Sequence, residues 1–537
     1  MKLLCRPALA SLLLFLVLAG CVALAPPSVP LPLPPSVPLP PPSSAAAPSP
    51  ASAPTPDTGD QPPLAPREFR AAWVATVANI DWPSKPGLAS EVQRSEAIAL
   101  LNRAQTLGLN ALILQVRAAG DAIYPSTLEP WSEFLSGEQG RAPGLPGEPA
   151  YDPLAFWVQE AHRRAIELHV WFNPYRARQS SAKSPLVAPH LGVRQPALVK
   201  RSGDQLWIDP GEPAAAAHML AVVADVVRRY DVDGVHIDDY FYPYPVSVPA
   251  VNGVEVPFPD DESYARYRLA GGQQAREDWR RGNVDSLVQQ LYSTVHAVKP
   301  WVRVGISPFG IGKPERRPPG ITGFSQYDKL YADVELWLAK GWLDYLAPQL
   351  YWPIDRVGQR FPLLLEQWIA ENPLQRHLWP GLFTSRVTRR GEALGPQSWP
   401  AREILDQVQQ QRQRGGKAGG HIHFSMAALM QDRDGVATQL QAGAYAQAAL
   451  VPATPWLDDQ PPPAPTLRGN GTRVTIEPGV GEPAARWAVW RRQSGLWRFA
   501  VLPGSQRLID PLGADLLVVS AVDRVGNQGA SHILKLP

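Results

Sequence analysis

From residue 67 onward the sequence alternates short apolar runs with longer amphipathic stretches, and this alternation limits the fold more than any other feature. The apolar runs have the length of β-strands and lie at 69–76, 111–117, 168–175, 234–240, 302–309, 345–352, 378–385 and 419–426. Helical patterns separate them, for example at 91–107, 154–166, 213–229, 283–298, 328–340 and 401–414. Strands that alternate with helices build parallel α/β sheets, and about eight such units predict a (β/α)₈ barrel of the TIM type. A doubly wound open sheet is the alternative, but no Gly-rich phosphate turn follows the first run.

Side chains of a barrel strand point alternately into the barrel and toward the surrounding helices. In the fourth run, His236, Asp238 and Tyr240 lie on the side opposite to Val235 and Ile237, so they are expected inside. The same reasoning places these further residues inside: Gln115, Arg117, Trp171, Asn173, Tyr175, Gln349, Tyr351, His423 and Ser425. Buried polar groups cost free energy unless they are bonded, and barrel active sites form at the carboxyl ends of the strands. The pattern therefore predicts a site for a polar ligand at that end.

A barrel mouth with carboxylates, hydrogen-bonding groups and aromatic rings suits a sugar polymer. Glycoside cleavage needs an acid that protonates the leaving oxygen and a second group that stabilises or attacks the oxocarbenium-like centre. Asp238 is the first catalytic candidate because it points inward, and Asp239 is the second because it follows at the end of the strand. Repulsion between adjacent carboxylates raises one pKa, which suits an acid. Capping of the next loop is the alternative role of Asp239.

Other residues on these runs are expected to bind the substrate. Asn173, Gln349 and Tyr351 offer groups that hold hydroxyl or acetamido groups, and Trp352 offers a ring that stacks on a sugar. For His236, three roles stay open: orienting Asp238, contacting a sugar, and bonding to the backbone within the core. The full set of substrate-binding candidates is Arg117, Asn173, Tyr175, His236, Tyr240, Gln349, Tyr351 and Trp352, of which Arg117 is expected mainly to fix a carboxylate by a bidentate pair. No His and carboxylate pair has metal-ligand spacing, so neither a metal nor a cofactor is expected.

The amino terminus has the layout of an export signal. An apolar stretch at 8–18 is too short to span a membrane and ends in Leu-Ala-Gly-Cys, with Cys21 as its last residue. Residues 1–21 resemble the signal and lipobox of bacterial lipoproteins, in which the cysteine is lipidated; a plain signal peptide is the alternative. Val22 follows, and no Asp there signals retention at the inner membrane. The expectation is a lipid anchor at Cys21 in the outer membrane, facing the periplasm.

Two linkers divide the rest of the chain. Residues 22–66 are mostly Pro, Ala and Ser, a composition that cannot form a core and predicts a disordered tether. The barrel is expected over 67–455, and a second linker at 456–466 leads to short β-rich runs. Those runs, in 467–537, predict a small β-sandwich and resemble fibronectin type III modules.

The composition excludes some partners and chemistries. The net charge is +2 and no basic run stands out, so nucleic acid is not an expected partner. The only cysteines are Cys5 and Cys21. Both lie in the export segment, which leaves no disulfide or thiol chemistry for the folded part.

Several long segments resemble the glycosyl-hydrolase-like family 10 lipoproteins, and the likeness covers roughly 67–390 in chain order. The segments that carry it are REFRAAWVATVANIDWP at 67–83, LQVRAAGDAIYPSTLEPWS at 114–132, YDPLAFWVQEAHRRAIELHVWFNPYR at 151–176, YDVDGVHIDDYFYP at 230–243, DWRRGNVDSLV at 278–288, GISPFGI at 305–311 and GWLDYLAPQLYWP at 341–353. The resemblance implies a barrel glycosidase, and as its substrate it implies peptidoglycan glycan strands stripped of their peptides.

The segment from Asp233 to Tyr240 also resembles the fourth-strand motif of family 18 chitinases, in which an inward Asp polarises the substrate's acetamido group and a Glu two residues later is the acid. Asp238 matches the Asp, but Tyr240 stands where the Glu is expected. If this mechanism operates, Asp239 or a carboxylate from another loop must supply the proton. Three functions are consistent with these patterns: a hydrolase of peptidoglycan glycan, which is the prediction; a glycan-binding barrel without catalysis; and a structural envelope lipoprotein.

Overall fold

The computed structural model describes residues 59–149, 151–247, 255–469 and 471–537, and these described residues belong to one compact unit. The predicted export signal, Cys21 and most of the tether at 22–66 lie outside the described residues. Within the described ranges, no helix combines the length and the apolar character that crossing a membrane requires.

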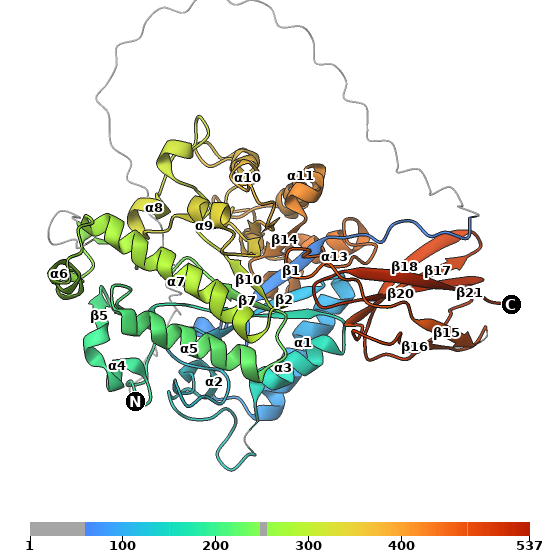
Figure 1. The fold of residues 1–537 in the computed structure, drawn as a ribbon, viewed down its shortest axis with the longest axis horizontal. Helices are drawn as coiled ribbons and strands as arrows, with labels where there is room; N and C mark the ends of the chain where they lie inside the picture. The colour runs from blue at the N-terminus through green and yellow to red at the C-terminus, as the bar shows by residue number, and fades with distance from the viewer. Residues whose placement is uncertain (1–58, 150, 248–254, 470) are drawn as a thin grey trace, which may run out of the picture. The chain divides into compact units, whose positions relative to one another are not determined.

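One parallel sheet forms the centre of the fold (Figure 1). In sequence order its strands are β1 (Phe69–Val74), β2 (Ala111–Arg117), β3 (Glu167–Phe172), β7 (Gly234–Ile237), β10 (Arg303–Ile306), β11 (Tyr345–Leu346), β12 (His377–Leu378), β13 (Gly381–Leu382) and β14 (Gly420–His423). They lie in the order β12-β11-β10-β7-β3-β2-β1-β14-β13. The two ends of this order, β12 and β13, belong to the same short segment, 377–382, so the sheet curls until both its edges meet on that segment. This is the topology of a barrel-type fold, and the open doubly wound alternative does not fit it.

Helices follow the strands and cover the outside of the sheet. The main ones are α1 (Ser90–Leu107), α3 (Pro153–His162), α5 (Pro213–Arg229), α7 (Arg276–Val298), α9 (Val334–Lys340), α10 (Phe361–Ala370), α11 (Ala401–Gln413) and α13 (Val436–Ala442). The other helices are α2 (Glu133–Ser136), α4 (Leu191–Arg194), α6 (Asp261–Leu269), α8 (Gln326–Lys329) and α12 (Met426–Met430). In Figure 1, α5 and α7 run side by side over the strands.

The predicted helices are confirmed, with three corrections to their bounds. The helix expected at 154–166 ends at His162. The helix expected at 283–298 begins at Arg276, and the one expected at 328–340 is two helices, α8 and α9. Between these two, Tyr331 has a φ of 56°, which no helix interior accommodates. Helix α10 was missed because its apolar residues read as a continuation of the preceding strand and loop.

The buried apolar residues of the barrel form two clusters, one inside the sheet and one between the sheet and the helices. The inner cluster includes Phe69, Trp73, Trp171 and Tyr345, while Val235 and Ile237 belong to the cluster shared with the helices. The alternation predicted for the fourth strand is therefore confirmed. The inner cluster combines large aromatic rings with small alanines, and the buried rings fill the space below the mouth.

The alternation predicted for the eighth strand is wrong. Ile422 pairs with the inward Ala71 in the parallel register and lies in the inner cluster. Because neighbours in register face the same side, His423 points outward, where its Nε2 lies 2.8 Å from the Tyr445 hydroxyl. The hydroxyl of Ser425, beyond the strand, donates to Asp81 at 2.7 Å.

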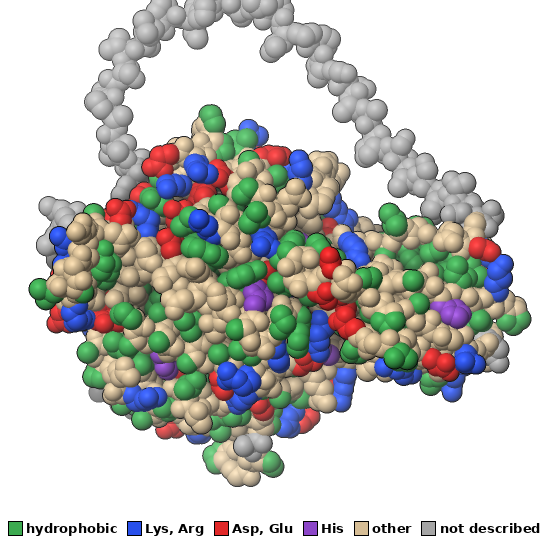
Figure 2. Space-filling model, in the orientation of Figure 1, with side chains coloured by type: hydrophobic (Ala, Val, Ile, Leu, Met, Phe, Trp, Pro, Cys, Tyr) green, Lys and Arg blue, Asp and Glu red, His purple; other side chains and the backbone are tan. Residues whose placement is uncertain are grey.

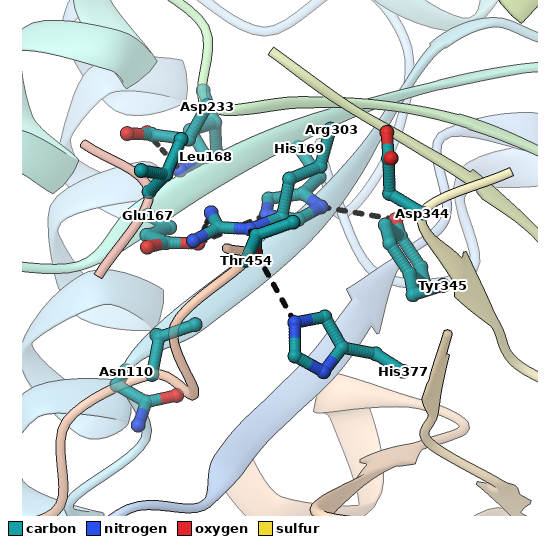
Figure 3. Close-up of polar contacts among 12 residues, drawn as sticks. Asn110, Glu167, Leu168, His169, Asp233, Arg303, Asp344, Tyr345, His377 and Thr454 are labelled. Carbon is teal, nitrogen blue, oxygen red and sulfur yellow. Dashed lines mark hydrogen bonds and ion pairs between the residues drawn. The ribbon is translucent and has the colours of Figure 1, made fainter. Parts of the chain in front are cut away.

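The amino-terminal end of the barrel contains a buried polar network rather than apolar packing (Figure 3). The His169 ring joins the Tyr345 hydroxyl, at 2.9 Å, to the Glu167 carboxylate, at 3.1 Å. Arg303 contacts the same carboxylate at 3.1 Å and donates to the Thr454 hydroxyl at 2.7 Å. Every ionised group in this network thus has a partner of opposite charge or a hydrogen bond, as burial demands.

The carboxyl-terminal residues form two antiparallel sheets. One contains β15 (Thr466–Gly469), β16 (Val474–Glu477) and β19 (Leu508–Ile509), and the other contains β17 (Arg486–Gln493), β18 (Leu496–Pro503), β20 (Leu516–Val522) and β21 (Gln528–Lys535). Both sheets contribute to one apolar cluster around Trp487 and Ile476. The predicted β-rich module is therefore present, while its likeness to fibronectin type III stays a prediction.

Small sheets lie in the loops after two barrel strands. The loop after β3 contains β4 (Arg176–Arg178), β5 (Val199–Ser202) and β6 (Gln205–Ile208), and the loop after β7 contains β8 (Val246–Ser247) and β9 (Glu255–Val256). On the face drawn in Figure 2, acidic and basic side chains are interspersed, and hydrophobic side chains are scattered among them.

Candidate active site

Asp238 and Asp239 lie just beyond the end of β7 and are almost completely buried, with 4% and 3% of their surface exposed. The Oδ2 atom of Asp238 accepts two hydrogen bonds, from Trp171 Nε1 at 2.9 Å and from Asn173 Nδ2 at 3.2 Å. Its other oxygen, Oδ1, has no hydrogen-bond partner among the described residues. One oxygen is thus held in place, and the other is left for a proton or a ligand.

The surroundings of Asp238 favour its neutral form. Burial raises its pKa to about 7, and the neighbouring Asp239 adds to the rise, against the opposing effects of Arg176 and the Trp171 hydrogen bond. Near neutral pH this carboxyl group therefore still carries a proton in a large fraction of the molecules.

Asp239 is bonded differently. Its Oδ2 accepts a hydrogen bond from the Tyr244 hydroxyl in the following loop. Burial raises the pKa of Asp239 as well, whereas the bonds from Tyr244 and Gln349 lower it. The contact with Tyr244 ties the loop to the carboxylate, so the capping role considered for Asp239 and a catalytic role are compatible.

Arg176 was not predicted as a site residue, although its positive charge acts on both aspartates. Its guanidinium lies 4.0 Å from the centre of the Tyr240 ring, and its charge lowers the pKa of both Asp238 and Asp239. Strand β3 ends at Phe172, so the alternation of sides no longer holds at positions 175 and 176. The prediction for Tyr175 fails for the same reason: this residue is fully buried in the apolar cluster shared with the helices.

Two further candidates, Arg117 and His236, are buried and bonded to other residues of the barrel. Arg117 forms a bidentate pair with Glu129, at 2.8 and 2.6 Å, which confirms the expectation that it fixes a carboxylate and leaves no support for a role in substrate binding. His236 accepts from Trp73 Nε1 at 3.1 Å, lies 3.0 Å from the Tyr345 hydroxyl, and is likewise buried away from the mouth. Burial holds the pKa of His236 well below its usual range, so the ring is neutral.

Asn173 has two structural contacts that fix its orientation. Its amide nitrogen donates to Asp238, and its amide oxygen accepts from the backbone nitrogen of Arg176 at 3.2 Å. It is fully buried. Asn173 therefore positions the carboxyl group of Asp238 and the segment of Arg176, instead of holding a sugar hydroxyl as predicted.

Two groups of half-buried aromatic rings lie close to the acidic pair. One includes Tyr244, which donates to Asp239, and the other includes Tyr351, whose pKa is raised by burial and then by the charge of Asp239. The first group is Tyr240, Tyr244, Phe309, Phe324 and Trp352, and its neighbouring rings have centroids 5.0 to 6.5 Å apart. The second group is Tyr351, Phe383, Trp399 and Phe424, with separations of 4.7 to 6.2 Å. The predicted residues Tyr240, Tyr351 and Trp352 are thus among the rings at the mouth. Phe309, Phe324, Phe383 and Trp399 were not predicted, because they lie on loops or at strand ends where sequence alternation gives no direction.

Gln349 connects the acidic pair to the neighbouring strand. Its amide nitrogen donates to the backbone oxygen of Ser307 at 3.0 Å, and its side chain favours the ionised form of Asp239. Neither Asp238 nor Asp239 belongs to a metal-type cluster: within the described ranges, the only group of three such ligands is elsewhere, at Asp458, Glu482 and Asp523.

The glycosyl hydrolase-like 10 family matches residues 68–394, which is the region that contains β1 to β13 and both aspartates. The chain belongs to this family. Consistent with that membership, it is 40% identical over 417 residues to the glycosyl hydrolase YngK of Bacillus subtilis (strain 168), covering 76% of this chain and 77% of YngK. It is 35% identical over 356 residues to the glycosyl hydrolase DigH of Escherichia coli (strain K12), covering 61% of this chain and 77% of DigH. The chain is thus a glycosidase.

The solved structures to which the chain shows some similarity include the PgaB (BpsB) glycoside hydrolase domain from Bordetella bronchiseptica. It is 15% identical, with a TM-score of 0.44, over 70% of this chain and 98% of that one. The catalytic domain of β-amylase from Paenibacillus polymyxa is 10% identical, with a TM-score of 0.44, over 71% of this chain and 98% of that one.

Proposed function

We propose that this glycosidase cleaves the glycan of the bacterial cell wall, and specifically peptidoglycan strands that have lost their peptides. The observation that carries a hydrolytic function is the pair Asp238 and Asp239, which are adjacent in sequence, buried, and close to aromatic rings of both groups. Aromatic faces suit the apolar faces of sugar rings, and paired carboxyl groups suit glycoside hydrolysis. The choice of peptidoglycan rests on the resemblance of the long sequence segments to the family's lipoproteins.

In the proposed mechanism Asp238 is the general acid. Both donors, Trp171 and Asn173, point at Oδ2, so the proton of the neutral form resides on Oδ1, the oxygen without a partner. From there it passes to the glycosidic oxygen as the bond to the anomeric carbon breaks. A pKa of about 7 keeps this proton available at neutral pH.

Asp239 acts as the carboxylate of the pair. The hydroxyl of Tyr244 donates to it, and Arg176 and Gln349 also favour its ionised form. An ionised Asp239 stabilises the positive charge that develops on the sugar ring. Water then attacks the anomeric carbon and gives one proton to the Asp238 carboxylate, which restores the acid. The two adjacent carboxyl groups thus hold one proton between them. The neutral member acts as the acid and the ionised member stabilises positive charge, as in other enzymes with paired acids.

We further propose that the enzyme is anchored by a lipid on Cys21 at the periplasmic face of the outer membrane. The tether at 22–66 then carries the barrel, 67–455, away from the membrane, and the carboxyl-terminal module is of the fibronectin type III kind. A proline-rich tether of this length reaches on the order of 140 Å when extended, at about 3.1 Å per residue. Such a reach suits a substrate that lies at a distance from the membrane.

The test is digestion of purified peptidoglycan by the full-length protein in detergent, with products identified by mass spectrometry. Peptide-free and peptide-bearing strands are compared, and Asp204→Asn, an exposed acid in the same half of the barrel, is the matched control for Asp238→Asn. We expect cleavage of peptide-free strands by the wild type and by Asp204→Asn, and none by Asp238→Asn. Equal cleavage of both substrates would contradict the proposed specificity for peptide-free strands. Binding without any product would contradict the proposed hydrolysis of this polymer.

A further inference from the structure

Three acidic side chains from different segments meet at the edge of the carboxyl-terminal module. Asp458 lies in the linker, Glu482 precedes β17, and Asp523 follows β20. One carboxylate oxygen from each lies within 4.8 Å of the others. Asp458 is half-buried, Glu482 is exposed, and Asp523 has 0% of its surface exposed.

Asp523 provides a second, independent indication of a ligand. Its Oδ1 accepts from the backbone nitrogens of Val525, at 2.9 Å, and Asn527, at 2.8 Å, which fixes the orientation of the carboxylate. Its Oδ2 is buried and has no hydrogen-bond partner among the described residues. A buried carboxylate oxygen without a partner is rare, because its loss of hydration is not compensated. A bound ion would compensate it.

Two arginines near this cluster, Arg67 and Arg524, make their hydrogen bonds to other groups. Arg524 donates to Asp231 of the barrel at 2.7 Å, and Arg67 donates to backbone oxygens, including that of Gly526 at 2.8 Å. In the part of the chain that the structure describes, none of the three carboxylates forms an ion pair.

We propose that Asp458, Glu482 and Asp523 bind a calcium ion. All three ligands are oxygens, which suits a hard cation, and oxygens in one Ca²⁺ shell, at 2.3–2.6 Å from the ion, lie at most about 5 Å apart. The exposed side leaves room for water to complete a shell of about six to eight ligands. Mg²⁺ fits less well, since it needs a smaller and more regular octahedron.

The ion would fasten the linker to the module. A hydrogen bond from Asn527 Nδ2 to the backbone oxygen of Asp458, at 2.8 Å, already joins these two segments. A calcium ion held by the three carboxylates would join the same two segments a second time. Asp458 and Asp523 are more than sixty positions apart in the sequence. The site is remote from the acidic pair in sequence and involves none of its residues, so this inference does not depend on the proposed mechanism.

The experiment is calorimetric titration of the full-length protein with CaCl₂ after treatment with EGTA and removal of the chelator. Glu482→Gln is the test variant, since this exposed side chain supports no other contact in the described structure. Asp459→Asn is the matched control, because it removes one charge from the same linker outside the cluster. Asp523→Asn is a second test variant that retains an acceptor at Oδ1 for the two backbone nitrogens.

We expect one Ca²⁺ per chain with a Kd on the order of 10⁻⁴ to 10⁻³ M, as in extracellular calcium modules. Glu482→Gln and Asp523→Asn should each weaken binding about tenfold or more, while Asp459→Asn keeps the wild-type Kd. The absence of binding at 10-fold excess over about 10⁻³ M would overturn the proposal. Equal weakening by Asp459→Asn would overturn it too, because it would indicate non-specific attraction, and so would equal affinity for Mg²⁺.

Discussion

The indole nitrogen of Trp171 donates to Asp238 Oδ2 at 2.9 Å, so a residue inside the barrel fixes a carboxyl group at its mouth. Asn173, two positions along the same strand direction, donates to the same oxygen at 3.2 Å. The arrangement determines which oxygen of Asp238 is free. It also makes the protonation state of Asp238 depend on residues that do not touch a substrate.

The first prediction concerns pH. Because the pKa of Asp238 is raised to about 7, its acid form is present below that pH and disappears above it. The value of kcat/KM on glycan should therefore fall as the pH rises through about 7, by tenfold per pH unit at the alkaline end. Initial rates measured from pH 5 to 9 provide the test. An alkaline limit near pH 9, or none, would contradict the assignment of Asp238 as the acid.

The second prediction concerns Trp171→Phe, which removes the donor to Asp238 but keeps an aromatic ring. The lost hydrogen bond had favoured the ionised carboxylate, so the pKa of Asp238 rises. We expect the alkaline limit of kcat/KM to move up by about 0.5–1 pH unit, as one hydrogen bond is worth about 1 kcal/mol. The control is Trp157→Phe, a buried tryptophan of the helical layer whose indole nitrogen has no partner in the described structure. That variant should keep the wild-type limit; a shift of equal size in both would mean that the effect is structural.

The third prediction concerns stability. Folding raises the pKa of Asp238 from about 4 to about 7, so the folded chain holds a proton that the unfolded chain releases. The free energy of unfolding of the wild type therefore falls as the pH rises between those values, and a neutral residue at this position avoids the loss. Relative to wild type, Asp238→Asn should gain about 2–3 kcal/mol between pH 5 and pH 8. Urea unfolding at both pH values checks this, with Asp204→Asn as the exposed control that should show no such gain.

The fourth prediction concerns the contact of the carboxyl-terminal module with the base of the barrel. Arg486 lies 3.4 Å from Glu167 and 3.7 Å from Asp233, both of which are buried. Arg486→Met should lower the free energy of unfolding by about 3 kcal/mol, because it leaves two buried carboxylates with one partner fewer. The control is Arg498→Met, an exposed arginine of the same module, with an expected change below about 0.5 kcal/mol. Equal stability of the two variants would show that the contact is not part of the folded core.

The fold could be predicted from the sequence because the helical and the alternating patterns of apolar residues lie where the helices and strands are. Apolar runs and helical patterns mark the strands and helices, and in β7 the alternation correctly separates His236 from Val235 and Ile237. Alternation does not fix which side is inner, however. In β14 the polar His423 was assigned inside, whereas the parallel register with β1 places Ile422 there. Register is a property of two strands and is not visible in either one alone.

The site was predicted less completely for a related reason. Asp238 and Asp239 lie directly after a strand, where the direction of the chain is still that of the sheet. Arg176 and Tyr175 come later, after the chain has turned, and their directions depend on contacts with Tyr240 and with the helical layer. Arg117 appeared as a ligand because its partner, Glu129, lies in a loop that no periodicity connects to β2.

The role of Asp238 as the acid is tested most directly with two substrates for Asp238→Asn. One is the natural glycan, whose leaving oxygen needs a proton, and the other is an N-acetylhexosamine with a dinitrophenyl leaving group, which does not. Our account predicts that kcat/KM falls by about 10³-fold or more on the glycan and by less than about tenfold on the activated glycoside. An equal loss on both substrates would contradict it.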